Sequence, residues 1–427
     1  MSKNIVFIDG CRTPFLRSGG AYIDLMSYQL GQFAIKGLLL KTGIDPKEID
    51  SVVMGTVISN VQTSNVAREA ALTAGIPYST PCQTVSQACI SANRAISNGI
   101  MEIMSGQAEV VVAGGVENTS DSPIGYKKAM RKKLFKAQKL KGMGDSLKFL
   151  FSLRPGDFLP DRPRVAEYST NRTMGQDCEI LVSNLKVNRE EQDAFAARSH
   201  QLAAKAMEKG HLQEEMCEVS LPPKFKSIKK DNGIRPDTNE EKLARLRPAF
   251  DKKYGSLTAG NSSFLTDGGA AVLIMTEEKA KSLGLKPKAK IVDFVFTGQS
   301  LEDELLLGPT YATSRILKKT GMSLSDFDVI EFHEAFAGQI MANLNALASD
   351  EFARKKLGRE IAVGKMPMEK FNLWGGSLSI GHPFGATGAR LVTTTANRLI
   401  KEKGRYGLLA ACAAGAHGHA MILENIS

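Results

Sequence analysis

Strand and helix patterns alternate along the first 120 residues, and this alternation limits the possible folds more than any other feature of the sequence. The apolar runs NIVFIDG, SVVMGTV and AEVVVAGG have the length and composition of buried strands. Between the first two lies SYQLGQFAIKGLLLKTG, which has helical spacing and ends at Gly43, a residue type that commonly terminates helices. Strands that alternate with helices predict βαβ units, so we expect an α/β fold.

The pattern changes between residues 123 and 249 and then returns. The middle segment is charged and rich in helix formers, and its clearest helix begins at Asn188, has Glu191 three residues later and ends at Gly210. Near the C-terminus, GHPFGATGARLVTTTANRLIKEKG followed by RYGLLAACAAG repeats the loop–helix–strand order of QACISANRAISNGIMEIMSG followed by AEVVVAGG, which indicates a duplicated half. The predicted units are an N-terminal half, an inserted loop domain, the completion of the N-terminal half and a C-terminal half, at residues 1–122, 123–249, 250–283 and 284–427.

Length and composition exclude several classes of protein. With 427 residues the chain exceeds the roughly 250–300 that one hydrophobic core accommodates. It contains no run of about 18 apolar residues, and its start, MSKNIVFIDG, resembles a strand rather than a signal or transit peptide, so we expect a cytoplasmic protein. The six cysteines show neither CxxC pairs nor metal-ligand spacing, which argues against a disulfide framework and leaves room for a catalytic thiol.

The net charge of +10 is concentrated in one segment. Residues 127–154 contain ten lysines and arginines and the single acid Asp145, so they carry +9 of it. The remainder is nearly neutral, unlike a protein that binds nucleic acid. Apolar side chains interleave with the lysines, which is typical of a helix on an anionic membrane. One alternative is a solvated face, and another is attraction of the phosphate groups of a ligand. The residues predicted to contact a membrane or partner are Lys132, Lys133, Phe135, Lys136, Phe149 and Phe151.

Four residues with reactive side chains lie at junctions between predicted elements. Cys89 precedes a helix whose apolar positions recur at helical spacing, and Cys412 ends a strand. His333 follows the apolar strand DVIEF, and His382 lies in the Gly-rich stretch GGSLSIGHPFGATG. Taken singly, a free cysteine is most often a small buried hydrophobe and a lone histidine a core group. Together, at junctions where α/β sheets bind their ligands, the four favour an active site.

The chemistry gives a reason for each position. The N–H groups and partial positive charge at a helix N-terminus are expected to lower the pKa of Cys89 toward the thiolate, and its own N–H can hold an oxyanion. A neutral histidine can take the thiol proton. Glycines around His382 and beyond Cys412 allow a substrate to approach the backbone closely.

Two other interpretations of these motifs are weaker. The stretch GHPFGATG lacks the lysine of a phosphate-binding P-loop and could be a tight turn. Cys412, His417 and His419 are too crowded on a Gly-rich turn to form a good metal cage, so no metal is expected.

The motifs DGCRTPF, QACISAN, AGGVENTS, LTAGNSSFLTDG, FHEAFAGQI, GGSLSIGHPFGATG and ACAAG occur in this order along essentially the whole chain. With them the sequence resembles the thiolase family, and in particular the 3-ketoacyl-CoA thiolases of the trifunctional-enzyme β-subunit type, which act in fatty-acid β-oxidation. Many thiolases have asparagine where this chain has His333, and the HEAF form is similar to the β-oxidation subunits. The resemblance implies a thiolase fold, with duplicated βαβ-type halves in a layered α-β-α-β-α core and an inserted helical loop domain.

The resemblance also implies a role for each reactive residue. Cys89 would be the nucleophile that is acylated, and His382 would take its proton and help to polarise the thioester oxygen of the acetyl unit. His333 would complete that first oxyanion site, and Cys412 would protonate the departing acetyl-CoA enolate and then activate the incoming CoA. The backbone N–H groups of Cys89 and Ala414 would form a second oxyanion site around the acyl-enzyme. The residues expected along the pantetheine of CoA are Ser263, Ala259 and Gly260.

The implied activity is that of an acetyl-CoA C-acyltransferase, which uses CoA as co-substrate and no bound cofactor. The implied partners are a second thiolase subunit or a larger assembly, a hydratase/dehydrogenase α-subunit, and a peripheral contact with the inner membrane surface. The nearest alternative is an acetoacetyl-CoA thiolase (acetyl-CoA acetyltransferase), against which His333 and the lipophilic basic segment argue. A decarboxylating ketoacyl synthase would not need Cys412, and a non-catalytic scaffold subunit would not need all four reactive residues.

One turn departs from the family pattern. Thiolases of this type usually continue the Cys412 turn with glycine and then a polar residue other than histidine, whereas this chain has Ala416 and His417. If Ala416 adopts a positive φ, its Cβ makes that conformation strained.

Overall fold

The computed structural model describes residues 4–161 and 166–427. Within them the main element is a mixed sheet of ten strands, nine of which follow the order β12-β13-β14-β11-β1-β10-β5-β3-β4, while β2 pairs with β10. The strands are β1 (Ile5–Arg12), β2 (Leu16–Arg17), β3 (Ser51–Gly55), β4 (Cys82–Val85), β5 (Val110–Glu117), β10 (Thr266–Thr276), β11 (Ala289–Gly298), β12 (Val329–Phe332), β13 (Tyr406–Ala413) and β14 (His417–Asn425). The predicted α/β class is confirmed.

The sheet consists of two halves that meet where β1 pairs with β11. This junction joins only Val6 with Lys290 and Phe7 with Ala289. In the N-terminal half, β3 is parallel to β4 and β5, and β10 runs antiparallel between β5 and β1. In the C-terminal half, β12 is parallel to β13, and β14 runs antiparallel between β13 and β11. Each half therefore combines parallel strands, three in the N-terminal half and two in the C-terminal half, with an antiparallel return strand.

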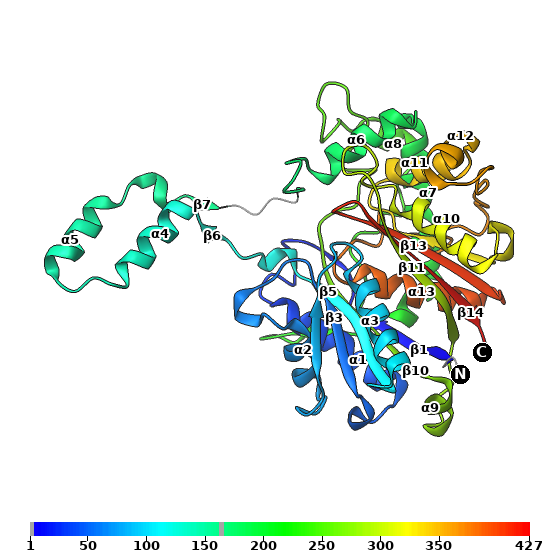
Figure 1. Cartoon of the computed structure of the whole chain (residues 1–427), viewed down its shortest axis with the longest axis horizontal. Coiled ribbons are helices and arrows are strands. Elements are labelled where there is room, and N and C mark those ends of the chain that lie inside the picture. Colours follow the sequence, from blue (N-terminus) through cyan, green and yellow to red (C-terminus); the bar gives the residue numbers. More distant parts are fainter. Residues whose placement is uncertain (1–3, 162–165) are drawn as a thin grey trace.

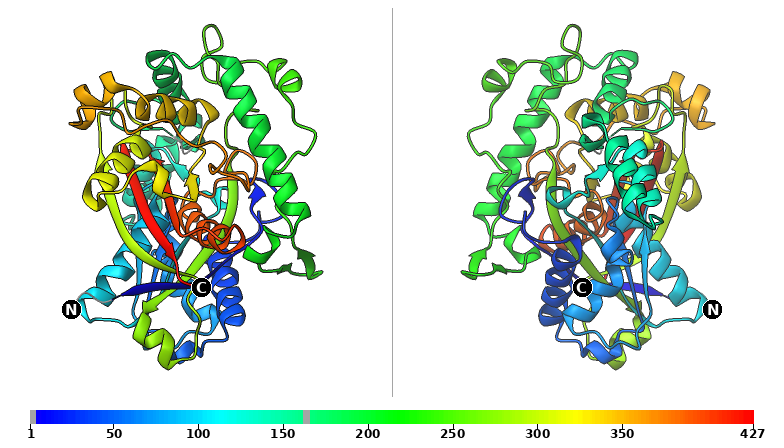
Figure 2. Two further views of the ribbon diagram at one scale, coloured as in Figure 1. Left: turned by 90° about the vertical axis from the view of Figure 1, so that its right-hand side faces the viewer. Right: turned by 90° about the vertical axis from the view of Figure 1, so that its left-hand side faces the viewer.

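Helices form three layers around the two halves (Figures 1 and 2). In the middle layer, α3 (Ser91–Ser105) contacts β3 and β5, and α13 (Thr387–Lys401) contacts both α3 and the strands β12 and β13. On the N-terminal half, α1 (Ser27–Thr42) packs on β1, β10 and α2 (Val66–Ala74). On the C-terminal half, α10 (Gly308–Thr320) packs on β11 and β14. This is the predicted α-β-α-β-α layering.

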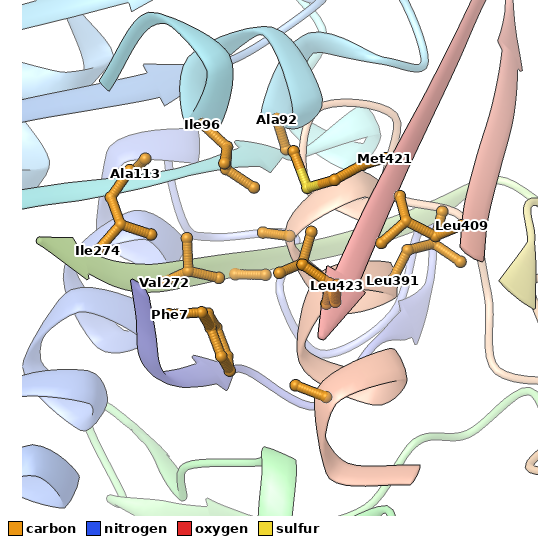
Figure 3. Packing of buried hydrophobic residues seen from close by; sticks show 14 of the residues in the cluster. Phe7, Ala92, Ile96, Ala113, Val272, Ile274, Leu391, Leu409, Met421 and Leu423 are labelled. Carbon is orange, nitrogen blue, oxygen red and sulfur yellow. The ribbon is translucent and has the colours of Figure 1, made fainter. Parts of the chain in front are cut away.

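The central core lies around α3 and α13. The predicted apolar positions of α3, Ala92, Ile96, Ile100 and Ile103, are all buried. They join Leu391 of α13 in one cluster, which Figure 3 shows together with side chains from several strands, among them Phe7, Val272, Leu409 and Leu423. Because each large apolar side chain that is buried contributes about 1.5–3 kcal/mol, this cluster anchors both helices to both halves of the sheet.

The middle of the sequence forms helices outside the layered core. Helix α7 (Arg189–Glu208) begins at the capping box of Asn188 and Glu191, as predicted, and together with α6 (Met174–Asn184) contacts α11 (Ala337–Leu347). The other α-helices of the structure are α4 (Lys128–Ala137), α5 (Met143–Ser152), α8 (Glu240–Ala244), α9 (Glu277–Ser282) and α12 (Asp350–Phe352). Two small sheets pair β6 (Gly125–Tyr126) with β7 (Pro160–Asp161) and β8 (Val219–Leu221) with β9 (Lys226–Ile228). Among the described residues, no helix has both the length and the apolar character needed to span a bilayer.

Helices α4 and α5 form an arm that projects from the rest of the molecule (Figure 1). The basic segment is therefore two helices, separated near Gly142, rather than one. Most of its large apolar side chains are exposed, including Phe135 and Phe151, which keep 69% and 81% of their surface accessible. The arm thus contributes little to the core and presents a mixed cationic and apolar surface.

Three glycines allow the segments of Cys89 and His382 to approach each other. A Cβ on Gly55, at the end of β3, would lie 2.5 Å from the backbone of Ser91, and one on Gly115 would lie 1.9 Å from the carbonyl oxygen of Gly385. The Gly55 oxygen itself is within 2.8 Å of where a Cβ on Gly115 or Gly385 would lie. Main-chain atoms of three distant segments therefore meet without any intervening side chain.

Replacing Gly115 with alanine is expected to force these segments apart, because the added methyl group meets backbone rather than a flexible side chain. We expect Gly115→Ala to lower the free energy of unfolding by about 1–3 kcal/mol, as overpacking does. The matched control is Gly144→Ala on the arm, where a Cβ would meet nothing within 4 Å and the change should stay within about 1 kcal/mol. Denaturant unfolding curves measure both, and equal effects of the two substitutions would refute this account of the contact.

Candidate active site

The predicted nucleophile lies in a tight turn between β4 and α3. Ala88, the residue before Cys89, has a φ of +46°, a conformation that costs a non-glycine residue energy. Ser91 stabilises the turn, since its hydroxyl accepts a hydrogen bond from the N–H of Gln87 (2.8 Å) and donates one to the carbonyl of Ala88 (2.7 Å). The turn places Cys89 just before the helix, where part of the residue is exposed but the sulfur lies in the interior.

A backbone N–H from the C-terminal half reaches the Cys89 sulfur. The backbone N–H of Ala414, in the turn between β13 and β14, lies close enough to lower the pKa of the Cys89 thiol, and the N–H of Cys89 itself acts in the same direction. These are the two donors expected to form the second oxyanion site. The structure therefore brings Cys89 and Ala414 together, although their sequence positions are far apart.

The turn that carries Ala414 contains the strained residue considered from the sequence. Ala416 has a φ of +56° and follows Gly415, whose φ is +79°. The N–H of Gln299 bonds the carbonyl of Ala416 at 3.0 Å, and the N–H of Gly415 bonds the carboxylate of Glu167. Ala416 therefore has the positive φ for which strain is expected from the sequence, and these two bonds hold the turn in place.

His382 is held as a neutral base. Its Nδ1 lies 2.7 Å from the hydroxyl oxygen of Thr387, and that hydroxyl donates its own hydrogen to the carbonyl of Pro383 (2.9 Å). The Thr387 oxygen must then accept from His382, so the imidazole proton is on Nδ1 and the lone pair is on Nε2. Burial, assisted by the positive charge of Arg390, lowers the pKa of His382 to about 3.

His333 lies beside His382, with ring centroids 4.0 Å apart. It follows β12, and its backbone N–H bonds the carbonyl of Ala410 in β13 at 2.8 Å. Its Nδ1 is 3.0 Å from the hydroxyl of Ser377. Burial, then the neighbouring His382 and Arg390, hold its pKa well below the usual range. Among the described residues no protein group bonds Nε2 of either ring, so both nitrogens are free to act on a ligand.

Cys412 is the second thiol of the site. It is the penultimate residue of β13 and is 1% exposed. Burial raises its pKa, and the nearby Cys89 raises it further. Because its neutral form is stabilised, Cys412 can supply a proton to a developing carbanion.

The expectation that the helix N-terminus activates Cys89 is wrong for the free protein. Burial raises the pKa of its thiol to about 11, and the nearby N–H groups of Ala414 and of Cys89 itself only partly offset this. The buried carboxylate of Glu117 acts in the same direction as burial. Desolvation outweighs the partial charge at the end of α3, so the thiol is neutral and requires a base when it reacts.

The residues expected to contact CoA lie next to the His333 segment. The N–H of Ser263 bonds the carbonyl of Ala335 at 3.0 Å, two residues after His333. Ala259 is exposed, whereas Gly260 and Ser263 are partly buried. This loop therefore borders the site from the solvent side, and its contact with CoA stays a prediction.

Four residues that support the site were not identified from the sequence. The hydroxyls of Thr387 and Ser377 hydrogen-bond Nδ1 of His382 and His333, respectively, and Arg390 hydrogen-bonds Ser377. Glu117, with its pKa raised to about 7 by burial, accepts hydrogen bonds from the N–H groups of Val57, Ile58 and Gly385. Thr387, Ser377 and Glu117 lie in motifs already quoted for the family, but only their contacts distinguish them from ordinary polar residues.

Comparison with known proteins agrees with this geometry. Residues 5–278 match the model of the thiolase N-terminal domain, and residues 285–425 match that of the thiolase C-terminal domain. The chain belongs to the thiolase family. As a thiolase it is an acyltransferase that uses CoA as a substrate.

Relatives of this thiolase match it over nearly its whole length. It is 53% identical to the human mitochondrial trifunctional enzyme subunit beta over 422 residues, which cover 99% of this chain and 88% of the relative. It is 46% identical to the 3-ketoacyl-CoA thiolase of Pectobacterium atrosepticum, covering 98% of this chain and 96% of the relative. The crystal structure of human mitochondrial 3-ketoacyl-CoA thiolase in complex with CoA aligns with a TM-score of 0.83 and 30% identity, over 99% of this chain and 98% of that one.

The reactivity of Cys89 toward iodoacetamide tests the neutral state of the thiolase site. Since the pKa of Cys89 is about 11 and that of His382 about 3, thiol and imidazole are both neutral near neutral pH. Alkylation needs the thiolate, so its rate at Cys89 should rise about tenfold per pH unit between about pH 7 and pH 9. Peptide mass spectrometry measures the rate. A rate that does not change with pH in this range would indicate a preformed thiolate–imidazolium pair and would contradict the assignment.

Proposed function

We propose that this thiolase cleaves 3-ketoacyl-CoA with CoA in fatty-acid β-oxidation, giving acetyl-CoA and a shortened acyl-CoA. The observation that carries the proposal is the site itself, in which the N–H of Ala414 acts on the Cys89 sulfur, a second neutral thiol lies nearby, and two neutral imidazoles lie side by side. Relatives named trifunctional enzyme subunit beta and 3-ketoacyl-CoA thiolase support the substrate class.

In the first half of the reaction, Nε2 of His382 takes the proton of Cys89 and the sulfur attacks the 3-keto carbon. The resulting oxyanion is held by the N–H groups of Cys89 and Ala414. The bond between carbons 2 and 3 then breaks, and its electron pair passes to the thioester as an enolate, which His333 and His382 stabilise. Cys412 protonates the enolate carbon, so acetyl-CoA leaves and the acyl group stays on Cys89.

In the second half, the Cys412 thiolate takes the proton of the incoming CoA thiol. The CoA sulfur attacks the acyl carbon, and the same two N–H groups hold the oxyanion. Cys89 leaves as a thiolate and recovers its proton from His382, while Cys412 is again a neutral thiol. All atoms and charges return to the starting state, so no cofactor takes part in the cycle.

The alternative function is that of an acetoacetyl-CoA thiolase. The fold does not separate the two, because the acetyl-CoA acetyltransferase of Bacillus anthracis aligns with the same TM-score of 0.83, over 100% of this chain and 99% of that chain, at 33% identity. The higher identity to the β-subunits and the presence of His333 in place of asparagine favour the longer substrates.

We also propose that the chain works within an assembly in the cytoplasm. The name of its relatives, subunit beta of the trifunctional enzyme, supports a hydratase/dehydrogenase α-subunit as partner, and the family resemblance supports at least a homodimer. The mammalian relatives are named as mitochondrial proteins, so the cytoplasmic location rests on the sequence of this chain alone. Light scattering on the purified chain, alone and mixed with a purified α-subunit, measures both masses against the 46.2 kDa monomer.

The arm of α4 and α5 is the proposed site of peripheral membrane contact at the inner membrane surface. Lys132 and Lys136 are exposed one helical turn apart, and Phe135 lies between them. Phe151 is exposed on α5, whereas Phe149 is partly buried. These residues combine positive charge with apolar surface, as an interfacial helix requires.

Lys133 is not free to serve this contact. Its Nζ pairs with the carboxylate of Asp157 at 2.6 Å and also bonds the carbonyl of Ser152. Lys133 therefore connects α4 with the end of α5, and its predicted role shifts from the membrane surface to the structure of the arm.

Thiolysis assays with short, medium and long 3-ketoacyl-CoAs test the proposed reaction. Cys89→Ala should lower kcat by at least about a thousandfold, because the acyl-enzyme cannot form. Cys82→Ala is the matched control, since Cys82 is a partly buried cysteine in β4 outside the site. Activity restricted to acetoacetyl-CoA would support the alternative function, and full activity of Cys89→Ala would exclude the mechanism.

Co-sedimentation with phosphatidylglycerol vesicles tests the arm. The double variant Lys132→Glu/Lys136→Glu should bind at least about tenfold more weakly, because each lysine near an anionic surface contributes about 1 kcal/mol. The control is Lys281→Glu/Lys286→Glu, which makes the same charge change at exposed positions in and just after α9, away from the arm in Figure 1. Equal loss in both variants would show that net charge, and not the arm, governs binding.

A further inference from the structure

Each of the two histidines of the site binds a side-chain hydroxyl through Nδ1. His382 donates from Nδ1 to Thr387, which places its proton on Nδ1. Nδ1 of His333 faces Ser377 at 3.0 Å. In each ring Nε2 is buried and has no protein partner among the described residues. The direction of the bond between Ser377 and His333 therefore decides what Nε2 of His333 offers to a substrate.

The bonds of Ser377 settle this direction. Nη2 of Arg390 lies 3.1 Å from the Ser377 oxygen, and because a guanidinium only donates, the serine oxygen is the acceptor. Ser377 is fully buried, so its own hydrogen is not directed to solvent. Within the described part of the chain, Nδ1 of His333 is the remaining polar partner of this hydroxyl. Since buried hydroxyls use their hydrogen, Ser377 donates to Nδ1.

We propose that Ser377, oriented by Arg390, is a positioning residue that fixes neutral His333 with its proton on Nε2. His333 then donates a hydrogen bond to the substrate oxygen, whereas His382, with its proton on Nδ1, presents a lone pair. The two adjacent rings thus have complementary roles, one as donor and one as base. The chemical consequence rests on the proposed thiolase reaction, but the assignment of the tautomer does not.

His333 can donate a hydrogen bond from Nε2 only as the neutral tautomer with its proton on that nitrogen, because the charged ring is disfavoured. Burial and nearby positive charge disfavour the imidazolium form, which would donate from both nitrogens. Arg390 is fully buried. Within the described residues its side chain makes one hydrogen bond, to the hydroxyl of Ser377, and its Nη1 lies 4.0 Å from the carboxylate of Glu331. A hydroxyl that accepts from a cation becomes a stronger donor, so Arg390 strengthens the bond from Ser377 to His333.

The test compares Ser377→Ala with Ser379→Ala. Ser379 is equally buried and lies two residues along the same segment, but its hydroxyl bonds Gly376 and Ser199 and touches no histidine. Ser377→Thr keeps the hydroxyl and serves as the rescue variant. The readouts are the ring-nitrogen NMR signals of protein labelled with ¹⁵N-histidine, with His333 assigned from the signals that His333→Asn removes, and the kcat and KM of thiolysis.

The wild-type spectrum should show His333 protonated on Nε2, and Ser377→Ala should lose this signature. We expect kcat to fall about tenfold in Ser377→Ala, less than the hundredfold or more for deleting an oxyanion donor, with KM nearly unchanged. Ser379→Ala should change neither readout, and Ser377→Thr should restore both.

Different results overturn different claims. A wild-type His333 protonated on Nδ1 would overturn the assignment, and so would equal loss of kcat in Ser377→Ala and Ser379→Ala with an unchanged tautomer. An Nε2-protonated His333 that is lost in Ser377→Ala, in a protein without thiolysis activity, would support the assignment and reject the proposed function.

Discussion

The active site depends on the close contact of Gly55, Gly115 and Gly385. At this point the end of β3, the end of β5 and the His382 loop meet main chain to main chain. Ser91, from the turn that carries Cys89, packs against Gly55. A side chain at any of these positions would separate the segments that carry the nucleophile and the base. Helices α3 and α13 can therefore pack against each other in the middle layer, between the two halves of the sheet.

Desolvation determines the chemical state of the site once these segments are together. Burial raises the pKa of Cys89 and Cys412 and lowers that of His333 and His382, so all four side chains are neutral. Neutral reactive side chains suit a reaction in which charge develops only transiently on substrate oxygens, because donors of fixed geometry are then matched to the transition state rather than to a charged ground state. Thr387 and Ser377 complete this arrangement by giving the two imidazoles opposite tautomers.

The sequence was sufficient for features that depend on local pattern. The helix that ends at Gly43, the capping box at Asn188 and the buried stripe of α3 all follow from residue type and spacing, and the structure has them. The positions of the reactive residues at junctions also agree with the structure. Their roles in catalysis stay predictions, as do the domain boundaries.

What the sequence could not provide depends on tertiary contacts. The pKa of Cys89 was predicted in the wrong direction because the helix N-terminus is visible in the sequence, whereas the extent of burial is not. The partners of the histidines were missed because a serine or threonine acquires its function only when a ring nitrogen lies within hydrogen-bond distance. Lys133 was assigned to a membrane surface because its ion pair with Asp157 forms only when α4 folds beside the end of α5.

Trapping of the acyl-enzyme tests whether a neutral Cys89 is acylated with His382 as its base. The protein is mixed with a 3-ketoacyl-CoA in the absence of free CoA, and intact-mass and peptide mass spectrometry locate the acyl group. The account predicts one shortened acyl group on Cys89, with one equivalent of acetyl-CoA released, and no adduct in His382→Gln. An acyl group on another residue, or undiminished acylation of Cys89 in His382→Gln, would contradict it.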